Sequence, residues 1–300
     1  MTTIPRPTTD SLHKAVADKV AVVSGAARGI GFATAGLLAR SGAKTVLVDL
    51  SEGILKQACS TIGLQTTYRV CDVSSWNQQA KMFQWVQEKY GSIDILVCNA
   101  AVNPEIAPQR VSDPERKVQM NEQVYYNYLA DQRTSTEGNA PLEKPSTQLF
   151  DINVNSVVYG LKLGVHYMKK NGGRIVVTGS AGSYLPIPSQ PLYAASKHAV
   201  LGLVRSTSCM PEVVASGVTI SLVAPWLTLT SMVEGLKEAT NPDTLKSSPE
   251  DVAWAIAFAA AGSKEQSHGK GFWIQGSTIT EVESSYWEVT ERLMSPENRF

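Results

Sequence analysis

Residues 20–40 have the sequence VAVVSGAARGIGFATAGLLAR, an apolar run followed by three closely spaced glycines and a helix-like stretch. Val20–Ser24 predicts a buried strand and Phe32–Arg40 predicts the helix after it. Glycines permit a tight turn and close backbone approach, and free N–H groups at a helix N-terminus attract anions. A plain glycine turn is the alternative, but the context favours a pyrophosphate site formed by Gly25, Ala27, Arg28, Gly29, Ile30 and Gly31.

Outward from this stretch, short apolar runs alternate with longer helix-like stretches. The predicted strands are Val20–Ser24, Thr45–Asp49, Gln65–Asp72, Ile93–Cys98, Gly173–Thr178, Val218–Val223 and Gly271–Ile274. The predicted helices are Gly31–Arg40, Gly53–Thr61, Trp76–Tyr90, Phe150–Lys170, Tyr193–Ala215 and Glu250–Ala261. This alternation is typical of βαβ units, so we expect an α/β fold: a Rossmann-type, doubly wound, parallel seven-stranded sheet with helices on both faces.

The predicted organisation is a single domain over residues 19–276, with an N-terminal arm at 1–18 and a C-terminal tail at 277–300. Residues 103–147 interrupt the alternation with an insertion that is long for a loop of this kind. The insertion holds a candidate helix, Lys117–Gln132, with three tyrosines. It is interpreted either as a lid or oligomer contact or as a tolerated surface excursion.

Composition excludes several classes of function. Lys plus Arg and Asp plus Glu each total 27, so the formal net charge is zero, which argues against nucleic-acid and membrane partners. Four scattered cysteines without a CxxC pair, and histidines without ligand spacing, favour reduced thiols and no metal site. No apolar run reaches the length of a membrane span and the N-terminus lacks a signal-peptide core, so we expect a cytoplasmic protein.

Acidic residues end the second and third predicted strands. Asp49 follows Gly31 by 18 residues, where a carboxylate can accept hydrogen bonds from an adenosine ribose and repel a 2′-phosphate. This favours NAD over NADP, although Asp49 could simply start a turn and Arg28 could meet a 2′-phosphate in another geometry. Asp72 is a candidate for holding the adenine amino group, with a helix-entry role as the alternative.

Tyr193 and Lys197 are spaced to share one face of a helix. An ammonium near a phenol favours the phenolate, as would a cationic nicotinamide ring, so Tyr193 could exchange a proton with an alcohol or ketone during hydride transfer. Ser180 follows the strand Gly173–Thr178 at the carboxyl edge of the sheet, where doubly wound folds bind ligands. Its hydroxyl is therefore a candidate hydrogen-bond donor to the reacting oxygen.

Together, these residues make the sequence resemble a short-chain dehydrogenase/reductase from Lys19 to about Gly276. The resemblance rests on Ser24–Gly31, Asp72-Val73, Asn99-Ala100-Ala101, Asp151–Val154, Ser180, Tyr193–Lys197 and Pro225–Thr230. It implies that Tyr193 is the general acid/base, that Lys197 lowers its pKa and binds the nicotinamide ribose, and that Ser180 orients the substrate oxygen. Asn153 would hold a water that completes a proton relay through Lys197.

The resemblance also implies the remaining cofactor contacts. Asn99 would steady the adenosine end and the central sheet, and Thr228–Thr230 would meet the nicotinamide carboxamide. The full set of expected cofactor-binding residues beyond the glycine loop is Asp49, Leu50, Asp72, Val73, Asn99, Ala100, Tyr193, Lys197, Pro225, Thr228 and Thr230.

Two departures from the family pattern bear on the site. Pro225-Trp226 replaces the usual Pro-Gly, so the local turn should differ, and the indole either walls the substrate pocket or packs against the sheet. The Ala-Pro-Trp segment is similar to fungal members related to 15-hydroxyprostaglandin dehydrogenase. Gly276-Ser277 replaces the common Gly-Gly after the last strand. The resemblance also implies that Thr230–Lys246 is a mobile lid over the substrate. The predicted substrate-binding residues are Met232 in this lid, together with Ser180, Tyr193 and Trp226.

The sequence thus predicts an NAD-dependent enzyme that interconverts a secondary alcohol and a ketone on a hydrophobic small molecule, such as a secondary-metabolite intermediate. A non-redox enzyme on the same scaffold (isomerase, epimerase or cyclase) and a dinucleotide-binding regulator are the alternatives. The resemblance implies a homotetramer or homodimer, with Phe150–Lys170 and Tyr193–Ala215 at the interface.

Overall fold

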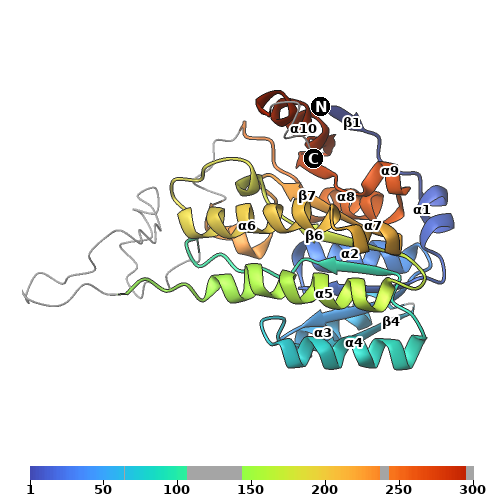
Figure 1. The fold of residues 1–300 in the computed structure, drawn as a ribbon. Coiled ribbons are helices and arrows are strands. Elements are labelled where there is room, and N and C mark those ends of the chain that lie inside the picture. The colour runs from blue at the N-terminus through green and yellow to red at the C-terminus, as the bar shows by residue number, and fades with distance from the viewer. Residues whose placement is uncertain (64, 107–143, 237–242, 295–300) are drawn as a thin grey trace, which may run out of the picture.

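The computed structural model describes residues 1–63, 65–106, 144–236 and 243–294. Within these ranges one sheet has nine strands in the order β1-β9-β8-β7-β6-β5-β2-β3-β4 (Figure 1). The strands are β1 (Thr2–Ile4), β2 (Val20–Ser24), β3 (Lys44–Asp49), β4 (Thr66–Val70), β5 (Ile95–Cys98), β6 (Gly173–Thr178), β7 (Val218–Pro225), β8 (Gly271–Gln275) and β9 (Thr278–Glu281).

The α-helices are α1 (Thr9–Val16), α2 (Gly29–Arg40), α3 (Glu52–Ile62), α4 (Trp76–Tyr90), α5 (Ser156–Met168), α6 (Pro191–Ser208), α7 (Pro211–Ser216), α8 (Pro249–Ala261), α9 (Lys264–Ser267) and α10 (Glu283–Leu293). Three short segments have other helical forms: a π-helix, η2 (Asp151–Asn155), and two 3₁₀ helices, η3 (Ala181–Ser183) and η4 (Ser231–Leu236).

Seven strands, β4-β3-β2-β5-β6-β7-β8, pair in parallel, which confirms the expected doubly wound Rossmann-type sheet. The chain leaves β2 for β3 on one side and later returns to β5 on the other, so the strand order reverses between β2 and β5. In open parallel sheets, ligands bind outside the carboxyl ends of the strands at this reversal. The topology therefore places the ligand crevice beside the turn that follows β2.

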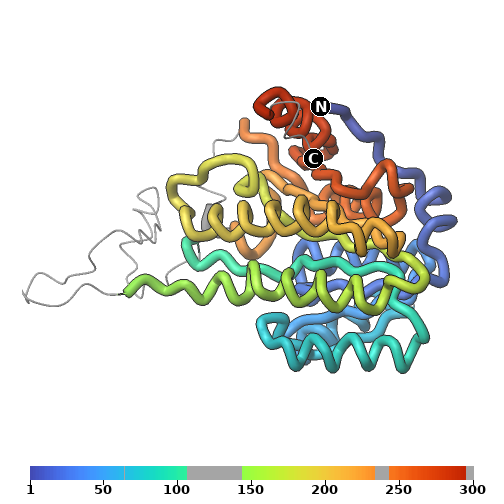
Figure 2. Tube along the Cα trace, in the orientation of Figure 1, coloured from blue at the N-terminus to red at the C-terminus, as the bar shows by residue number. Residues whose placement is uncertain are grey.

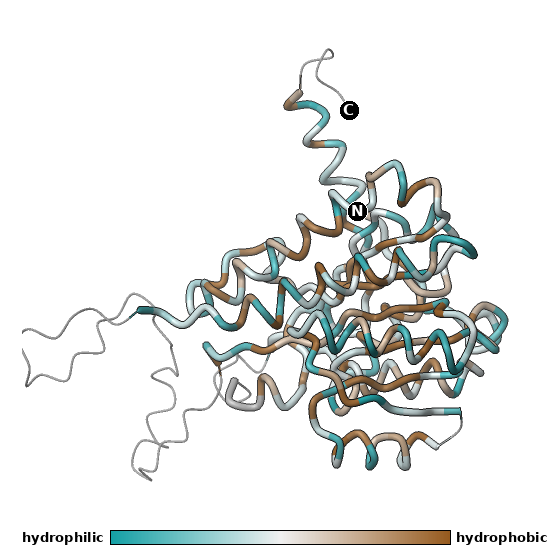
Figure 3. The backbone as a smooth tube through the Cα atoms, turned by 60° about the horizontal axis from the view of Figure 1, so that its bottom comes forward, coloured by the Kyte–Doolittle hydropathy of each residue, from teal (hydrophilic) through white to brown (hydrophobic). Residues whose placement is uncertain are grey.

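Alternating side chains of the strands feed two apolar cores, one on each face of the sheet. Ala21 and Val23 of β2 join the core under α1, α2 and α8, whereas Val20 and Val22 join the core under α4, α5 and α6. Figure 1 shows α4, α5 and α6 stacked along one side of the sheet, and Figure 3 shows the apolar residues concentrated in its strands. Burial on both faces explains the nearly continuous apolar runs.

Local sequence signals set the helix ends. Ser75 caps α4 by accepting the Gln78 N–H, and Gly91 ends it at φ +80°, a left-handed conformation suited to glycine. Ser248 starts α8 in a reciprocal capping box with Asp251. Helix α4 begins at the predicted residue, and α8 begins one residue before the predicted start, Glu250.

Two predicted helices are each divided in the structure. The stretch predicted as Tyr193–Ala215 forms α6 and α7, and Pro211 starts α7 because proline has no N–H to continue a helix from α6. The stretch predicted as Phe150–Lys170 begins with the π-helix η2 and becomes α-helical only at Ser156. Single π turns are frequent at functional sites.

Two strands that the sequence analysis did not predict extend the sheet beyond β8. Gly276 and Ser277 form a two-residue hairpin loop, with Gly276 at φ +58°, that turns β8 into the antiparallel strand β9. β9 then pairs with β1 near the N-terminus. Figure 2 shows the N-terminal strand beside the C-terminal helix, and the Met1 ammonium donates to Ser285 Oγ at 2.7 Å. Residues of the expected arm and tail therefore complete one sheet edge.

The candidate helix Lys117–Gln132 lies outside the described residues. The Thr230–Lys246 stretch is described in part, as η4 and the residues from 243 onward.

Candidate active site

The turn after β2 has the geometry of an anion-binding loop. Gly25 and Gly29 have φ of +64° and +56°, conformations that side-chain-bearing residues rarely adopt. Helix α2 starts at Gly29, and its N-cap residue, Arg28, makes no side-chain capping hydrogen bond. The first N–H groups of α2 are therefore left to a ligand, and the helix dipole favours a negative one. These residues fit the pyrophosphate of a dinucleotide.

Gly31 is confined by the loop that precedes it. A Cβ added at Gly31 would collide with the Gly25 carbonyl oxygen and lie 2.7 Å from Asn99 Nδ2. Only glycine fits here, so α2 packs directly on the loop that it follows.

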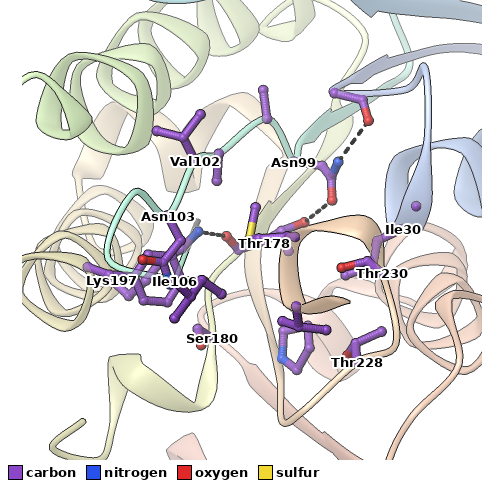
Figure 4. A pocket seen from close by; sticks show the side chains of 18 of the residues that line it. Ile30, Asn99, Val102, Asn103, Ile106, Thr178, Ser180, Lys197, Thr228 and Thr230 are labelled. Carbon is purple, nitrogen blue, oxygen red and sulfur yellow. Dashed lines mark hydrogen bonds between the residues drawn. The ribbon is translucent and has the colours of Figure 1, made fainter. Parts of the chain in front are cut away.

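Asn99, just after β5, fixes the glycine loop to the centre of the sheet (Figure 4). Its Nδ2 donates to the carbonyls of Ser24 (3.0 Å) and Gly25 (3.3 Å), and its Oδ1 accepts from Thr178 Oγ1 at 3.3 Å. Asn99 thus joins β2, β5 and β6 where the strands end.

The predicted adenosine end lies at the carboxyl ends of β3 and β4. The Asp49 carboxylate accepts from the backbone N–H groups of Ala27 (3.2 Å) and Leu50 (2.8 Å), which fixes its position beside the glycine loop. The Asp72 carboxylate accepts from the N–H and hydroxyl of Ser74. Asp72 is therefore used in the local turn, and it also lines the cavity.

Ser180, Tyr193 and Lys197 meet at the carboxyl end of β6. Ser180 caps η3 by accepting the Gly182 N–H, and its side chain is hydrogen-bonded to Tyr193. Lys197 lies one turn after Tyr193 on α6, with Nζ 5.6 Å from the centre of the phenol ring. That Nζ donates to the Thr178 carbonyl oxygen at 2.9 Å. The three groups required for proton exchange with a hydroxyl or carbonyl are thus assembled.

Burial shifts the pKa of both groups on α6. It raises the pKa of Tyr193, and the hydrogen bond with Ser180 opposes this rise. Burial lowers the pKa of Lys197 to about 8. The lowered phenol pKa expected from Lys197 is therefore not found in the protein alone, because desolvation of the phenolate is the larger effect.

The lowered pKa of Lys197 contributes stability that rises with pH between about 8 and the ordinary lysine value of 10.5, whereas the raised pKa values of the buried Cys71 and Cys98 thiols act in the opposite direction above pH 9. In that window the unfolded chain binds the proton that the folded chain has released, so unfolding becomes less favourable as pH increases. The gain is about 3 kcal/mol. Lys197→Met should make the slope from denaturant titrations more negative than that of the wild type in this window, whereas Lys162→Met, at an exposed position on α5, should leave the wild-type slope unchanged. An unchanged slope in Lys197→Met would refute the assignment.

Asn153 lies in η2 and is buried, and both N–H groups of its side-chain amide are hydrogen-bonded. Its Nδ2 donates to the Val102 carbonyl (2.9 Å) and to Ser196 Oγ (3.1 Å), and its Oδ1 accepts the Val102 N–H (2.8 Å). Ser196 Oγ in turn donates to the Tyr193 carbonyl at 2.7 Å. Asn153 therefore connects the loop after β5 to α6 on the buried side of the site.

A cavity of about 990 Å³ joins the glycine loop, the end of β3 and the β6–α6 groups. Most of the predicted site residues line it: Gly25, Arg28, Gly29, Ile30, Asp49, Leu50, Asp72, Val73, Asn99, Ala100, Ser180, Tyr193, Lys197, Pro225, Trp226, Thr228, Thr230 and Met232. Ala27, Gly31 and Asn153 do not line it. Each of these three instead supports another residue of the site. Ala27 donates a hydrogen bond to Asp49, Gly31 packs against Gly25, and Asn153 is hydrogen-bonded to Val102.

Trp226 combines both roles considered for it. It lines the cavity, and its ring stacks on Trp273 of β8 with centroids 5.9 Å apart. The loop between η3 and α6 also lines the cavity, with Leu185, Pro186, Ile187 and Pro188. This apolar loop was not predicted, although its position after Ser180 at the carboxyl edge was an available signal.

Sequence reasoning also missed three polar residues at this end. Asn103 and Gln190 both line the cavity, and Asn103 Nδ2 donates to Gln190 Oε1 at 2.8 Å. Glu105 is buried behind them and contacts the start of α6. Each pair joins positions more than 80 residues apart in the sequence, so no local pattern reveals it.

Among the described residues, no cluster of His, Cys, Asp or Glu side chains has the arrangement of a metal site. In the same residues, no helix combines the length and hydropathy needed to cross a bilayer.

Comparison with known proteins identifies the family. The family model described as short chain dehydrogenase matches residues 19–137 and 132–241. The mouse protein 15-hydroxyprostaglandin dehydrogenase [NAD(+)] is 32% identical over 232 residues, covering 74% of this chain and 72% of its own length. Short-chain dehydrogenase/reductase prx4 of Penicillium roqueforti is 30% identical, covering 96% and 84%. The chain therefore belongs to the short-chain dehydrogenase/reductase family.

Solved structures agree with this assignment. The crystal structure of levodione reductase has a TM-score of 0.68 and 25% identity, with 87% of this chain and 97% of that chain covered. Family membership and these relatives identify the chain as an oxidoreductase that acts on an alcohol or ketone.

Proposed function

We propose that the protein interconverts a secondary alcohol and a ketone with NAD(H) as redox partner. The observation that carries the proposal is one cavity lined by Ser180, Tyr193 and Lys197 together with the glycine loop and Asp49. Proton-exchanging groups at one end and an anion-binding helix terminus at the other fit a dinucleotide-dependent reaction.

Each residue of the site has a separate role in the proposed reaction. Bound NAD supplies a nicotinamide ring that exchanges hydride with the substrate carbon and, when oxidised, favours a nearby phenolate by its positive charge. Ser180 Oγ donates a hydrogen bond to the substrate oxygen. Tyr193 Oη accepts the hydroxyl proton when an alcohol is oxidised and returns it when a ketone is reduced. Lys197 is held by the Thr178 carbonyl beside Tyr193, where its ammonium favours the ionised phenol and binds ribose.

Asn153 serves the relay indirectly. Both N–H groups of its amide are engaged by Val102 and Ser196, so we assign its water to a remaining oxygen lone pair of Asn153. This water continues proton transfer from Lys197.

We infer NAD rather than NADP from Asp49. Its charge beside the glycine loop opposes a 2′-phosphate, and a relative that bears NAD(+) in its name supports this choice. Asp49→Asn should raise the NADP-to-NAD ratio of kcat/KM by about 100-fold, because like charges in contact cost several kcal/mol. Steady-state kinetics with both cofactors measure the ratio. Asp94→Asn removes a carboxylate that also accepts a backbone N–H, but at the opposite edge, and should leave the ratio unchanged. A wild type that prefers NADP would contradict the role of Asp49.

The substrate class follows from the cavity wall. Trp226, Met232 and the Leu185–Pro188 loop are apolar, whereas Asn103 and Gln190 supply a small polar area. An apolar wall with few polar groups is typical of sites for hydrophobic small molecules. We therefore propose a hydrophobic alcohol or ketone as substrate.

A panel of alcohols and ketones, screened with NAD and NADP by reduced-nicotinamide absorbance, tests the proposal. Substrate-dependent absorbance change in stoichiometric amount supports redox turnover. Product formed without any net cofactor redox change would instead favour an isomerase, epimerase or cyclase, and cofactor binding without any product would favour a regulator. The homodimer or homotetramer built on α5 and α6 and the cytoplasmic location stay predictions, and a monomeric mass in light scattering would contradict the first.

A further inference from the structure

The segment 99–106 after β5 contacts both ends of the site. At its start, Asn99 holds the glycine loop through Ser24 and Gly25. Four residues further on, Asn103 donates to Gln190, which precedes α6. Glu105 then reaches the first turn of α6 itself. The segment thus connects the predicted cofactor loop to the helix that bears Tyr193.

Glu105 takes the place of a missing helix cap. The N-cap residue of α6, Gln190, makes no side-chain capping bond, and Pro191 at the first helical position has no N–H. The next two N–H groups belong to Leu192 and Tyr193. Glu105 Oε1 accepts the first at 3.2 Å, and Oε2 accepts the second at 2.7 Å. One carboxylate therefore satisfies both donors of the first turn.

Burying the negatively charged carboxylate of Glu105 is energetically unfavourable, so packing alone does not explain why this residue is a glutamate. Glu105 is fully buried, and no cation pairs with it in the part of the chain that the structure describes. Burial raises the pKa of its carboxyl, while the hydrogen bonds from Tyr193 and Leu192 oppose this rise. A glutamine has the same length but only one acceptor oxygen, so it cannot give a separate oxygen to each N–H group. The carboxylate is explained by the need to hold two adjacent N–H groups at once.

We propose that Glu105 is a positioning residue for the reaction: it fixes the backbone of Tyr193 so that the phenol stays against Ser180 and beside Lys197. This inference rests on the proposed role of Tyr193 as the proton-exchanging group. The shorter bond of Glu105 is made to the backbone nitrogen of Tyr193 itself, so loss of the carboxylate displaces the first turn of α6. A displacement below 1 Å at a reacting group can lower turnover by up to about 100-fold.

Most of the proposed cofactor contacts lie away from Glu105, although Tyr193 and Lys197 on α6 are themselves among them. The glycine loop follows β2 and Asp49 ends β3, and neither contacts Glu105 directly. A change at Glu105 should therefore lower kcat much more than it weakens NADH binding. A merely structural role would reduce the amount of folded protein but leave kcat per binding site unchanged.

The test uses Glu105→Gln and Glu105→Ala in the full chain, with NADH binding sites titrated by fluorescence. Per site, kcat should fall about 10-fold in Glu105→Gln and about 100-fold in Glu105→Ala, with a much smaller change in the Kd for NADH. Equal kcat per site in all three proteins overturns the proposal. The graded loss is expected because glutamine keeps one of the two acceptors.

Glu281 provides a matched control. It is also a buried carboxylate at a helix start, accepting the N–H groups of Glu283 (2.8 Å) and Ser284 (3.1 Å) at α10. Glu281→Gln makes the same chemical change away from the cavity and should leave kcat per site unchanged. An equal loss of kcat in Glu281→Gln and Glu105→Gln would overturn the specific role of Glu105.

A spectroscopic titration separates this proposal from the proposed function. The tyrosinate absorbance of each protein, minus that of the same protein with Tyr193→Phe, reports the ionisation of Tyr193 alone. Displacement of Tyr193 changes both the burial that raises its pKa and the hydrogen bond with Ser180 that lowers it, so the Tyr193 titration should shift in Glu105→Ala. If the wild type turns over no alcohol or ketone, the proposed function is wrong, but this titration still tests whether Glu105 positions Tyr193. A shifted curve supports the positioning role, and an unshifted one overturns it.

Discussion

Tyr193→Phe should lower kcat by at least about 1000-fold, with a much smaller effect on NADH binding, because the glycine loop and Asp49 are unchanged. The substitution removes only the phenol oxygen, the one atom in the proposed mechanism that exchanges a proton with the substrate. General acid–base catalysis contributes about 100- to 10,000-fold, and no other described side chain hydrogen-bonded to Ser180 could take over this proton. Reduced-nicotinamide absorbance gives kcat, and NADH fluorescence gives the Kd.

Tyr90→Phe is the control for this prediction. The Tyr90 hydroxyl is hydrogen-bonded to Thr67 Oγ1 at 2.9 Å, at the end of α4 and away from the cavity. Its loss should leave kcat at the wild-type value. If Tyr193→Phe kept more than a tenth of wild-type kcat, the proton would have to leave through another group and our assignment would be wrong.

Gly31→Ala should abolish tight NAD binding and lower the free energy of unfolding. The added Cβ would collide with the Gly25 carbonyl and with Asn99 Nδ2, and neither can yield without moving the loop or breaking the Asn99 clamp. Overpacking of this kind costs about 1–3 kcal/mol. Because the same loop is proposed to hold the pyrophosphate, we expect the Kd for NADH to rise by about 100-fold, which corresponds to roughly 3 kcal/mol.

Gly36→Ala, further along α2, tests whether the effect belongs to the loop. A Cβ there meets the mobile guanidinium end of Arg40 at 3.0 Å, which can move aside. Alanine also favours a helix over glycine by up to about 1 kcal/mol. Gly36→Ala should therefore bind NADH like the wild type. Weak binding in both variants would point to α2 as a whole rather than to the approach of Gly31 to Gly25.

The sequence was informative wherever the structure depends on neighbours in the chain. Nearly continuous apolar runs predicted most of the parallel strands, since strands covered on both faces are apolar along most of their length, whereas the half-exposed edge strand β4 has the mixed sequence TTYRV. The helical patterns predicted the starts of α4 and α8 to within one residue, beside the caps Ser75 and Ser248. Prediction failed at the sheet edge, where β1 and β9 are short and β1 pairs with β9 between residues as far apart in the sequence as Ile4 and Ile279. It failed also where Pro211 divides a stretch with continuous helical periodicity.

The site residues also divide into those that local sequence patterns predicted and those that depend on contacts between distant parts of the chain. The glycine loop, Ser180, Tyr193 and Lys197 could be predicted because each belongs to a short pattern whose spacing has a physical meaning. Other features depend on tertiary structure alone. Ala27, Gly31 and Asn153 support the site without lining the cavity. Trp226 stacks on Trp273, and Glu105 accepts hydrogen bonds from the start of α6. Local sequence determines which conformation and chemistry a residue can provide, whereas a contact across 80 residues depends on how the strands assemble.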